Sequence, residues 1–310
     1  MGLNDKKSEL LNFPKPFLKW AGGKTQLLND IDYFLPENFN SDIDKYFEPF
    51  VGGGAVFFHL IKKYNFDYVY LGDINGDLIL TYSVIKNNLE ELSDELKLLS
   101  NDFFSKNENE RKQMFYDIRE KFNEAHCIGS NIPKNNHIEI ASKLIFLNKT
   151  CFNGLYRVNK SGGFNVPFAN PKNPLIFDEK NLIKVSEVLS DVNLICGDYS
   201  LSEKFIDNSS FVYLDPPYRP INGKKHFEGY SKSAFNDDNQ KELADFCKRI
   251  SLKGAQFILN NSDPTNYIED DDFFEKLYSE FNIEKVYAKR SINSNAEKRG
   301  KISELLIYNF

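Results

Sequence analysis

Short apolar runs alternate with helix-like stretches along most of this chain, and this alternation restricts the possible folds more than any other feature. Runs with strand character cover residues 46–50, 67–71, 192–196, 211–214, 255–260, 284–288 and 305–308. Helix-like stretches lie between many of them, at residues 24–34, 55–63, 180–189 and 238–251. Alternation of this kind predicts an α/β fold in which helices cover both faces of a largely parallel sheet.

The alternation is interrupted between residues 77 and 170. Helical periodicity is present there at residues 78–99, 111–125 and 138–147, and a loop rich in glycine and asparagine follows. Helices without strands inside an α/β pattern indicate an inserted helical domain. We therefore predict a main domain of residues 1–76 and 177–310 and an insert of residues 77–176.

Composition excludes several classes of protein. Of the 310 residues, 41% are hydrophobic and 15% aromatic, so the chain can bury a substantial core. No apolar run approaches the roughly 18 residues of a membrane span, and residues 1–16 lack an apolar signal segment. The cysteines Cys127, Cys151, Cys196 and Cys247 are widely spaced, and we expect neither disulfides nor a metal site. A cytoplasmic location without a membrane partner fits these features.

The formal net charge of −6 argues against a general polyanion binder, although it permits a local basic face. Acidic residues are concentrated at residues 269–272. Basic residues are concentrated between residues 285 and 301, and they include Lys289, Arg290, Lys298 and Arg299. One basic strip on an acidic chain predicts weak, salt-sensitive binding to non-specific nucleic acid.

The motif Asp215-Pro216-Pro217-Tyr218 directly follows the apolar run of residues 211–214. Proline lacks a backbone N–H and restricts φ, so this turn is stiff and cannot continue into a helix. A carboxylate, an outward carbonyl and an aromatic ring on one rigid rim suit a planar amine such as that of adenine. Two acceptors on the amine hydrogens favour the pyramidal, nucleophilic nitrogen that methyl transfer requires. The alternative is an ordinary turn that ends a strand, in which Asp-Pro and Pro-Pro are common.

A glycine-rich turn and an acidic residue form a second candidate site. Gly52, Gly53 and Gly54 lie between a predicted strand and a predicted helix, where they would let the backbone approach a ligand closely. Asp73 ends the next strand about 20 residues later, where a carboxylate can bind ribose hydroxyls. Together they indicate a nucleoside cofactor, and the alternative is a tight loop with an Asp helix cap. The pattern departs from G-x-G-x-x-G, which counts against NAD.

A third candidate is the segment of residues 17–24. It contains the only Trp of the chain, Trp20, beside two glycines and flanked by two lysines. Gly-Gly-Lys superficially resembles a phosphate loop, but the G-x-x-x-x-G-K-[ST] spacing is absent, so we set ATP hydrolysis aside. The alternative role of Trp20 is to cover an edge of the core.

Residues 148–168 interleave glycines, aromatic rings, amides and a guanidinium group. Arg can read guanine with two hydrogen bonds, and an apolar side chain can contact a thymine methyl. An aromatic ring can fill the gap left by an extruded base, and stacking of about 1–3 kcal/mol would offset much of the unstacking. The alternative is a β-hairpin that packs its aromatic rings on the helical insert.

Several separated segments occur in an order and spacing typical of one family. They are FLKWAGGK (17–24), EPFVGGGAVF (48–57), GDIN (72–75), NKTCFNGLYRVN (148–159), FNVPF (164–168), DPPY (215–218) and KRSINSNAEKR (289–299). Over residues 14–310 the chain resembles the Dam-like DNA adenine-N6 methyltransferases, which are site-specific and use S-adenosylmethionine. The resemblance implies a Rossmann-like class I methyltransferase sheet with an inserted helical DNA-recognition domain that ends in a hairpin. Gly163 departs from the acidic residue that many relatives carry there.

The resemblance also implies roles for individual residues. The implied cofactor contacts are Trp20, Lys24, Gly52, Asp73, Asp198 and Asp215. The implied DNA contacts are Lys19, Leu155, Arg157 and Pro167, which would read bases, and Phe152, which would wedge into the duplex. Asp215 and the Pro216 carbonyl would accept hydrogen bonds from the adenine amine, and Tyr218 would stack on the base. The implied target is GATC in double-stranded DNA, and a cognate restriction endonuclease is a possible partner.

Other functions stay open on the sequence alone. Methylation of an RNA amine or a protein amide would use similar acceptors, although the long hairpin and the wedge aromatic favour duplex DNA. A regulator that binds DNA without catalysis would keep the fold, although the intact motif at residues 215–218 argues against it. An NAD-dependent oxidoreductase is the most distant alternative. For methyl transfer, alignment and preorganised acceptors are sufficient, so we expect no metal.

Overall fold

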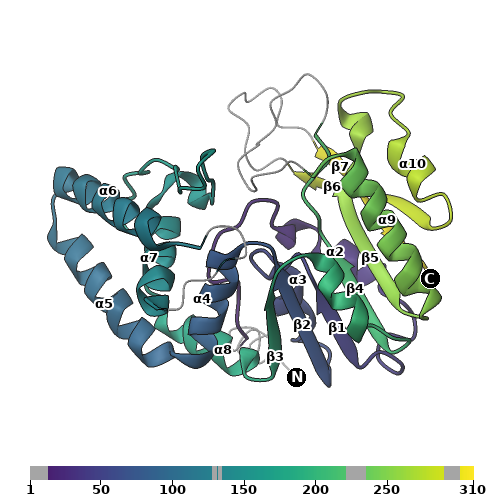
Figure 1. Ribbon diagram of the computed structural model, residues 1–310, viewed down its shortest axis with the longest axis horizontal. Coiled ribbons are helices and arrows are strands. Elements are labelled where there is room, and N and C mark those ends of the chain that lie inside the picture. The colour runs from purple at the N-terminus through teal and green to yellow at the C-terminus, as the bar shows by residue number, and fades with distance from the viewer. Residues whose placement is uncertain (1–12, 128–130, 132–134, 221–234, 290–300) are drawn as a thin grey trace, which may run out of the picture.

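A seven-stranded sheet lies at the centre of the residues that the computed structural model describes, which are 13–127, 131, 135–220, 235–289 and 301–310 (Figure 1). The strand order is β3-β2-β1-β4-β5-β7-β6. The strands are β1 (Lys45–Glu48), β2 (Tyr68–Asp73), β3 (Val192–Cys196), β4 (Ser210–Leu214), β5 (Gln256–Ser262), β6 (Asn282–Lys289) and β7 (Lys301–Tyr308). Each of the predicted strand runs is therefore confirmed, with shifts of a few residues at the ends. Residues 1–12 of the polar N-terminal segment lie outside the described ranges.

The sheet is mostly parallel. β3, β2, β1, β4 and β5 pair in parallel, whereas β7 runs antiparallel to both β5 and β6. All five residues of β4 are buried, which is the continuous apolar pattern of a strand covered on both faces. The mixed α/β prediction is confirmed, and the antiparallel pair at one edge is a feature that alternation alone does not reveal.

Two hydrophobic clusters cover the two faces of the sheet. Neighbouring residues of β1 divide between them, because Tyr46 belongs to one cluster and Phe47 to the other. The first cluster takes in α2 (Leu28–Tyr33), α3 (Ala55–Leu60), α4 (Gly76–Asn87) and α8 (Glu179–Leu189). The second takes in α9 (Asp237–Leu252) and α10 (Phe273–Leu277). Short 3₁₀ helices complete the described elements: η1 (Lys24–Gln26), η2 (Phe152–Gly154), η3 (Tyr199–Phe205) and η4 (Pro264–Asn266).

Three further helices lie between β2 and β3 in the chain and to one side of the sheet, namely α5 (Leu89–Ser105), α6 (Glu108–Ala125) and α7 (His137–Thr150) (Figure 1). The periodicity predicted over residues 78–99 is split between α4 and α5 at Asn88, whose φ is −137° and ψ 41°. α4 contacts β2, β3 and α7, so it joins these helices to the sheet.

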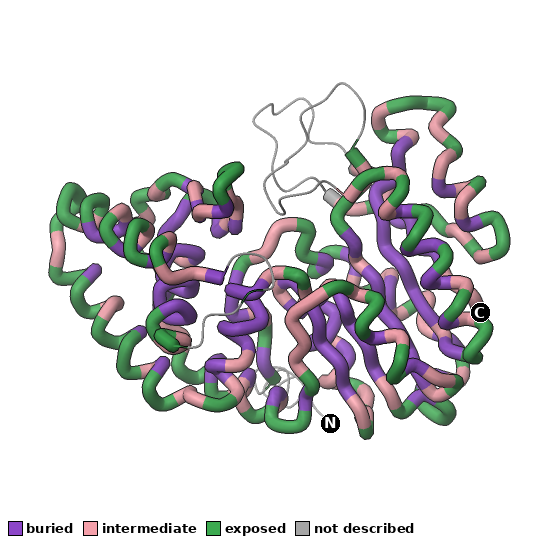
Figure 2. Tube along the Cα trace, viewed as in Figure 1, coloured by how far each residue is buried: buried purple, intermediate pink, exposed green. Residues whose placement is uncertain are grey.

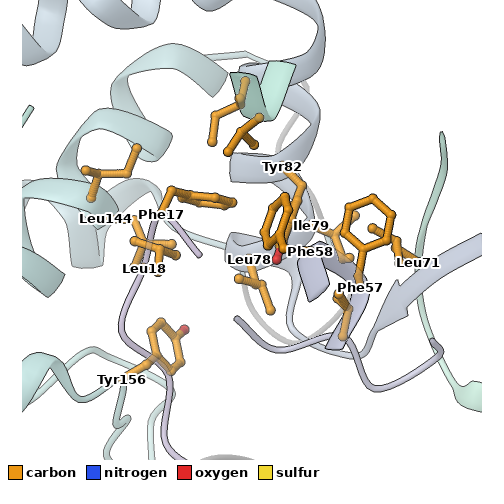
Figure 3. Close-up of a cluster of buried hydrophobic side chains, with 14 of the residues drawn as sticks. Phe17, Leu18, Phe57, Phe58, Leu71, Leu78, Ile79, Tyr82, Leu144 and Tyr156 are labelled. Carbon is orange, nitrogen blue, oxygen red and sulfur yellow. The ribbon is translucent and has the colours of Figure 1, made fainter. Parts of the chain in front are cut away.

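The core is continuous from the sheet into this helical segment, as the buried positions in Figure 2 show. Phe17 packs on Tyr82 of α4 with ring centroids 4.8 Å apart, and both belong to the cluster that also contains Leu144 of α7 (Figure 3). None of the helices in the described parts of the chain is long and apolar enough to cross a membrane.

Candidate active site

Acidic side chains gather at the carboxyl ends of three adjacent strands. β1 pairs in parallel with β2 on one side and β4 on the other, and Glu48, Asp73 and Asp215 lie at or just beyond the ends of these strands. Ligands of open α/β sheets bind at this edge. The structure therefore brings together Asp73 and Asp215, which the sequence predicted, and Glu48, which it did not.

The turn after β1 is held to the end of β2 by Asp73. The Gly52 N–H donates to Asp73 Oδ2 at 3.1 Å, and the Asn75 N–H donates to Oδ1 at 2.9 Å. Burial raises the pKa of Asp73 to about 6, although these backbone hydrogen bonds oppose the shift. Gly52 has a φ of +48°, and a Cβ atom there would lie 2.8 Å from Trp20 Cδ1. A side chain at this position is excluded by both the backbone conformation and the indole ring.

Lys24 and Asp215 form an ion pair at the centre of the site. Lys24 Nζ lies 2.7 Å from Asp215 Oδ2, and the lysine side chain is only 4% exposed. Nζ also donates to the Gly22 carbonyl at 2.7 Å. Burial raises the pKa of Asp215 to about 6, and Lys24 limits the rise. Near neutral pH the Asp215 carboxylate is therefore mostly ionised and can act as a hydrogen-bond acceptor.

The rim after Asp215 is fixed at successive residues. The Tyr218 hydroxyl donates to Glu304 Oε2 at 2.7 Å, and Asn260 Nδ2 donates to the same oxygen at 2.8 Å. Lys24 Nζ lies 5.2 Å from the centre of the Tyr218 ring. The Pro217 carbonyl accepts from Gln240 Nε2 at 3.3 Å. The stiffness that the two prolines predict is therefore reinforced from β5, β7 and α9.

Glu48 is a buried carboxyl group between the two predicted acids. It is 2% exposed and accepts from the Tyr46 hydroxyl at 2.7 Å. Burial raises its pKa to about 8, and the neighbouring charges of Asp215 and Asp73 add to the rise. The residue is therefore mostly protonated at neutral pH. Glu48 stands in the EPF sequence before the glycine turn, and an acidic residue that ends an apolar strand was the signal that could have found it.

The remaining predicted cofactor residues lie around this edge. Trp20 is half-buried, and its ring stacks on Tyr156 with centroids 5.3 Å apart and planes at 24°. Asp198 follows β3 at the same edge of the sheet, where it is exposed and accepts from the Ser200 N–H at 2.9 Å. In the structure, Asp198 caps the N-terminus of η3.

The predicted DNA contacts fall into two groups. Phe152 is 53% exposed, and its N–H donates to the Pro167 carbonyl at 2.9 Å, so these two residues lie together. Lys19 is exposed, and its backbone bonds in both directions to the buried Asn148 side chain, which also donates to the Gly154 carbonyl. Lys19 is thereby held beside the same loop.

Two other predicted contacts lie farther along that loop. Leu155 is half-buried, and Arg157 donates from Nε to Asn165 Oδ1 at 2.7 Å. The predicted hairpin consists of a loop with two isolated antiparallel bridges, which join Cys151 to Phe168 and Val158 to Phe164.

Lys285 is the member of the predicted basic strip whose side chain the structure describes. Lys285, the first basic residue of the strip, contacts Asp263 at 2.9 Å. The side chains of the other four predicted members lie outside the described residues: Lys289, Arg290, Lys298 and Arg299. Within the described residues, no group of three His, Cys, Asp or Glu side chains is arranged to hold a metal ion.

Comparison with known proteins gives a consistent result over nearly the whole chain. The sequence model of the D12 class N6 adenine-specific DNA methyltransferases matches residues 20–292. A Type II methyltransferase of Methanocaldococcus jannaschii is 49% identical over 298 residues, which cover 96% of this chain and 99% of that protein. A Type II methyltransferase of Lactococcus lactis is 35% identical over 96% of this chain and 95% of its own length. A DNA adenine methylase of Vibrio cholerae is 33% identical over 94% of this chain and 95% of its own length.

Proposed function

Because the chain belongs to the D12 class of N6 adenine-specific DNA methyltransferases, we propose that it moves a methyl group from S-adenosylmethionine to the N6 amine of an adenine extruded from duplex DNA. It is an adenine-specific DNA methyltransferase, and its family implies a DNA substrate and a methyl donor. The identity of the donor, the extrusion of the base and the roles of individual residues are the proposal. One observation supports it most strongly. Asp215 is paired with Lys24 at the start of the Pro-Pro-Tyr rim, and this rim lies beside the glycine turn that Asp73 holds.

The carboxyl edge of the sheet fits S-adenosylmethionine. The glycine turn is held beside Asp73, which offers a carboxylate to ribose hydroxyls. Trp20, Lys24 and Asp198 line the same edge as further contacts. The donor carries an ammonium and a sulfonium, and an edge with several carboxylates suits that positive charge. When bound, it supplies an activated methyl group.

Asp215 and Pro216 hold the target nitrogen in this mechanism. The Asp215 carboxylate and the Pro216 carbonyl accept hydrogen bonds from the amine and direct its lone pair at the methyl carbon. Tyr218 stacks on the base. Fixed acceptors lower the barrier because they are aligned before the reaction begins. The nitrogen would form its bond to the methyl carbon while the bond from that carbon to sulfur breaks and its electron pair stays on sulfur, so that S-adenosylhomocysteine leaves. The nitrogen would lose one proton, which the ionised Asp215 can accept.

Residues 77–176 form the proposed target-recognition domain, and residues 1–76 with 177–310 form the cofactor-binding catalytic domain. Phe152, exposed at the start of the loop after α7, would fill the space that the extruded base leaves. Lys19, Leu155, Arg157 and Pro167 would read neighbouring bases. We take GATC as the target sequence, since relatives such as that of Vibrio cholerae are named DNA adenine methylases. We take a cognate endonuclease as the partner, since two relatives are named Type II methyltransferases. The site of action would be the cytoplasm.

Expression in cells that lack adenine methylation tests the function and the target together. Genome sequencing that detects modified bases should find N6-methyladenine confined to one motif, with GATC as the expected sequence. The Asp215→Ala variant should leave the genome unmodified. An unmodified genome with the unaltered protein would overturn the function. Methylation confined to a different motif would overturn only the GATC assignment.

A further inference from the structure

Tyr156 connects the carboxyl edge of the sheet, where we propose that the cofactor binds, with the helical segment. It belongs neither to the motif at residues 215–218 nor to the glycine turn. It is 4% exposed and lies between Leu155 and Arg157 in the loop after α7. Its ring stacks on Trp20 at 5.3 Å, and its hydroxyl donates to Asp77 Oδ2 at 2.7 Å. The Tyr156 side chain thus joins the loop after α7, which we call the base-reading loop because of its proposed role, to Trp20 and to α4.

Trp20 also packs against the glycine turn of residues 52–54, which we call the cofactor turn. A Cβ at Gly52 would lie 2.8 Å from Trp20 Cδ1, and a Cβ at Gly53 would lie 3.1 Å from Trp20 Cβ. The indole therefore packs directly against the backbone of the turn, without an intervening side chain. A shift of the indole would displace the turn, because packed interiors deform little.

Asp77 anchors the other end of Tyr156. Its side chain is fully buried in the first turn of α4, where the helix dipole favours a carboxylate. It accepts from the Cys127 N–H at 2.6 Å and contacts His126 Nδ1 at 3.2 Å. Asp73, which holds the Gly52 N–H, lies four residues earlier in the same strand-to-helix connection. Two carboxylates of one rigid connection thus hold the cofactor turn and the base-reading loop.

We propose that Tyr156 is a positioning residue that couples the two ligands, so that DNA binding tightens cofactor binding and the reverse. The inference rests on the proposed function and adds to it. Contacts of DNA with Leu155 and Arg157 would restrict the motion of Tyr156 between them, and through it that of Trp20 and the glycine turn, so the second ligand meets a site whose freedom is already reduced. Coupling of this kind is reciprocal by thermodynamic necessity.

The measurement is the Kd of S-adenosylhomocysteine, which has no methyl group to transfer, with and without duplex DNA. The duplex carries the motif identified by genome sequencing. Trp20 is the only Trp of the chain and lies in the site, so its fluorescence reports binding directly. We expect the duplex to lower the Kd of the unaltered protein about 5-fold to 150-fold, the usual range of allosteric coupling.

Two variants of Tyr156 separate the ring from the hydroxyl. Tyr156→Leu removes the stack and the hydrogen bond, so the duplex should then change the Kd less than about twofold. Tyr156→Phe keeps the stack and should retain an intermediate ratio. The control is Asn170→Ala, which removes the hydrogen bond from the end of the same loop to Glu108 of α6 and leaves Tyr156, Trp20 and Asp77 in place. It should keep the ratio.

The outcomes distinguish this inference from the proposed function. Measurable binding of both ligands with no change of Kd on adding the duplex would overturn the coupling alone. An undiminished ratio in a folded Tyr156→Leu protein would do the same. Failure to bind either ligand would overturn the proposed function together with the inference.

Discussion

Replacing Lys24 with Met should move the acid limb of the pH–rate profile to higher pH. Asp215 has a pKa of about 6, because burial raises it and Lys24 limits the rise. An opposite charge within 4–6 Å typically lowers a carboxyl pKa by about 1–3 units, and Lys24 Nζ lies 2.7 Å from Oδ2. In Lys24→Met the pKa of Asp215 should therefore rise to about 7–9.

The direction in which the acid limb moves follows from the protonation state of Asp215 that the mechanism needs. The ionised carboxylate is the stronger acceptor for the amine and the form that can take up its proton, so the rate rises with pH through the pKa of Asp215. At pH 7, about nine-tenths of the unaltered protein has Asp215 ionised, and about a tenth of the variant would if its pKa were about 8. The rate at pH 7 should fall about tenfold from this cause and recover at about pH 9.

The assay is the initial rate of methyl transfer from pH 5 to 9.5, with both substrates below saturation so that the profile reports the free enzyme. Lys45→Met is the matched control, because Lys45 pairs with Asp207 near the opposite end of β1 and β4. Its acid limb should stay near that of the unaltered protein. An acid limb that stays near pH 6 in Lys24→Met, or moves lower, would refute the reasoning.

Three further predictions concern separate parts of the site. Glu304→Gln should move the same acid limb to lower pH, because the Glu304 charge raises the pKa of Asp215; an unmoved limb would contradict this. Glu48→Gln should raise the free energy of unfolding above pH 8 by on the order of a few kcal/mol, and this gain should shrink towards pH 4.5. Glu48 ionises near pH 4.5 in the unfolded chain but only near pH 8 in the folded protein, so it destabilises the fold increasingly as the pH rises through that interval. Equal melting temperatures of the two proteins at pH 8.5 would contradict it. Phe152→Ala should weaken binding of a duplex with an abasic site at the target adenine by about 1–3 kcal/mol but should affect less a duplex that has no target adenine, because the ring stacks only where a gap is present; equal losses for the two would exclude a wedge.

Local signals in the sequence predicted the parts of the site that depend on a few adjacent residues. The prolines after Asp215 and the glycines after β1 restrict their own backbone, and the strands before them bring both segments to one edge. Asp73 was predicted for the same reason, since it ends a strand next to β1.

Contacts between distant residues could not be predicted in this way. Tyr218 and Glu304 are separated by 86 positions, and Asp77 and Tyr156 by 79, so no local pattern pairs them. The sequence pattern also did not reveal the end of α4 at Asn88. α4 is buried on nearly every side and α5 is amphipathic, so apolar residues continue from one helix into the next. Periodicity reports which residues are apolar and carries no information on which helix they face.

Transfer of the methyl group under the control of Asp215 is the central claim, and nucleoside mass spectrometry tests it most directly. A duplex with one target adenine is incubated with labelled S-adenosylmethionine and then digested. The unaltered protein and Asp207→Asn, a control with an altered acid at the opposite edge of the sheet, should both yield labelled N6-methyldeoxyadenosine. Asp215→Asn should yield it at least about 10²-fold more slowly. An undiminished rate in Asp215→Asn, or label on any atom other than adenine N6, would contradict the account.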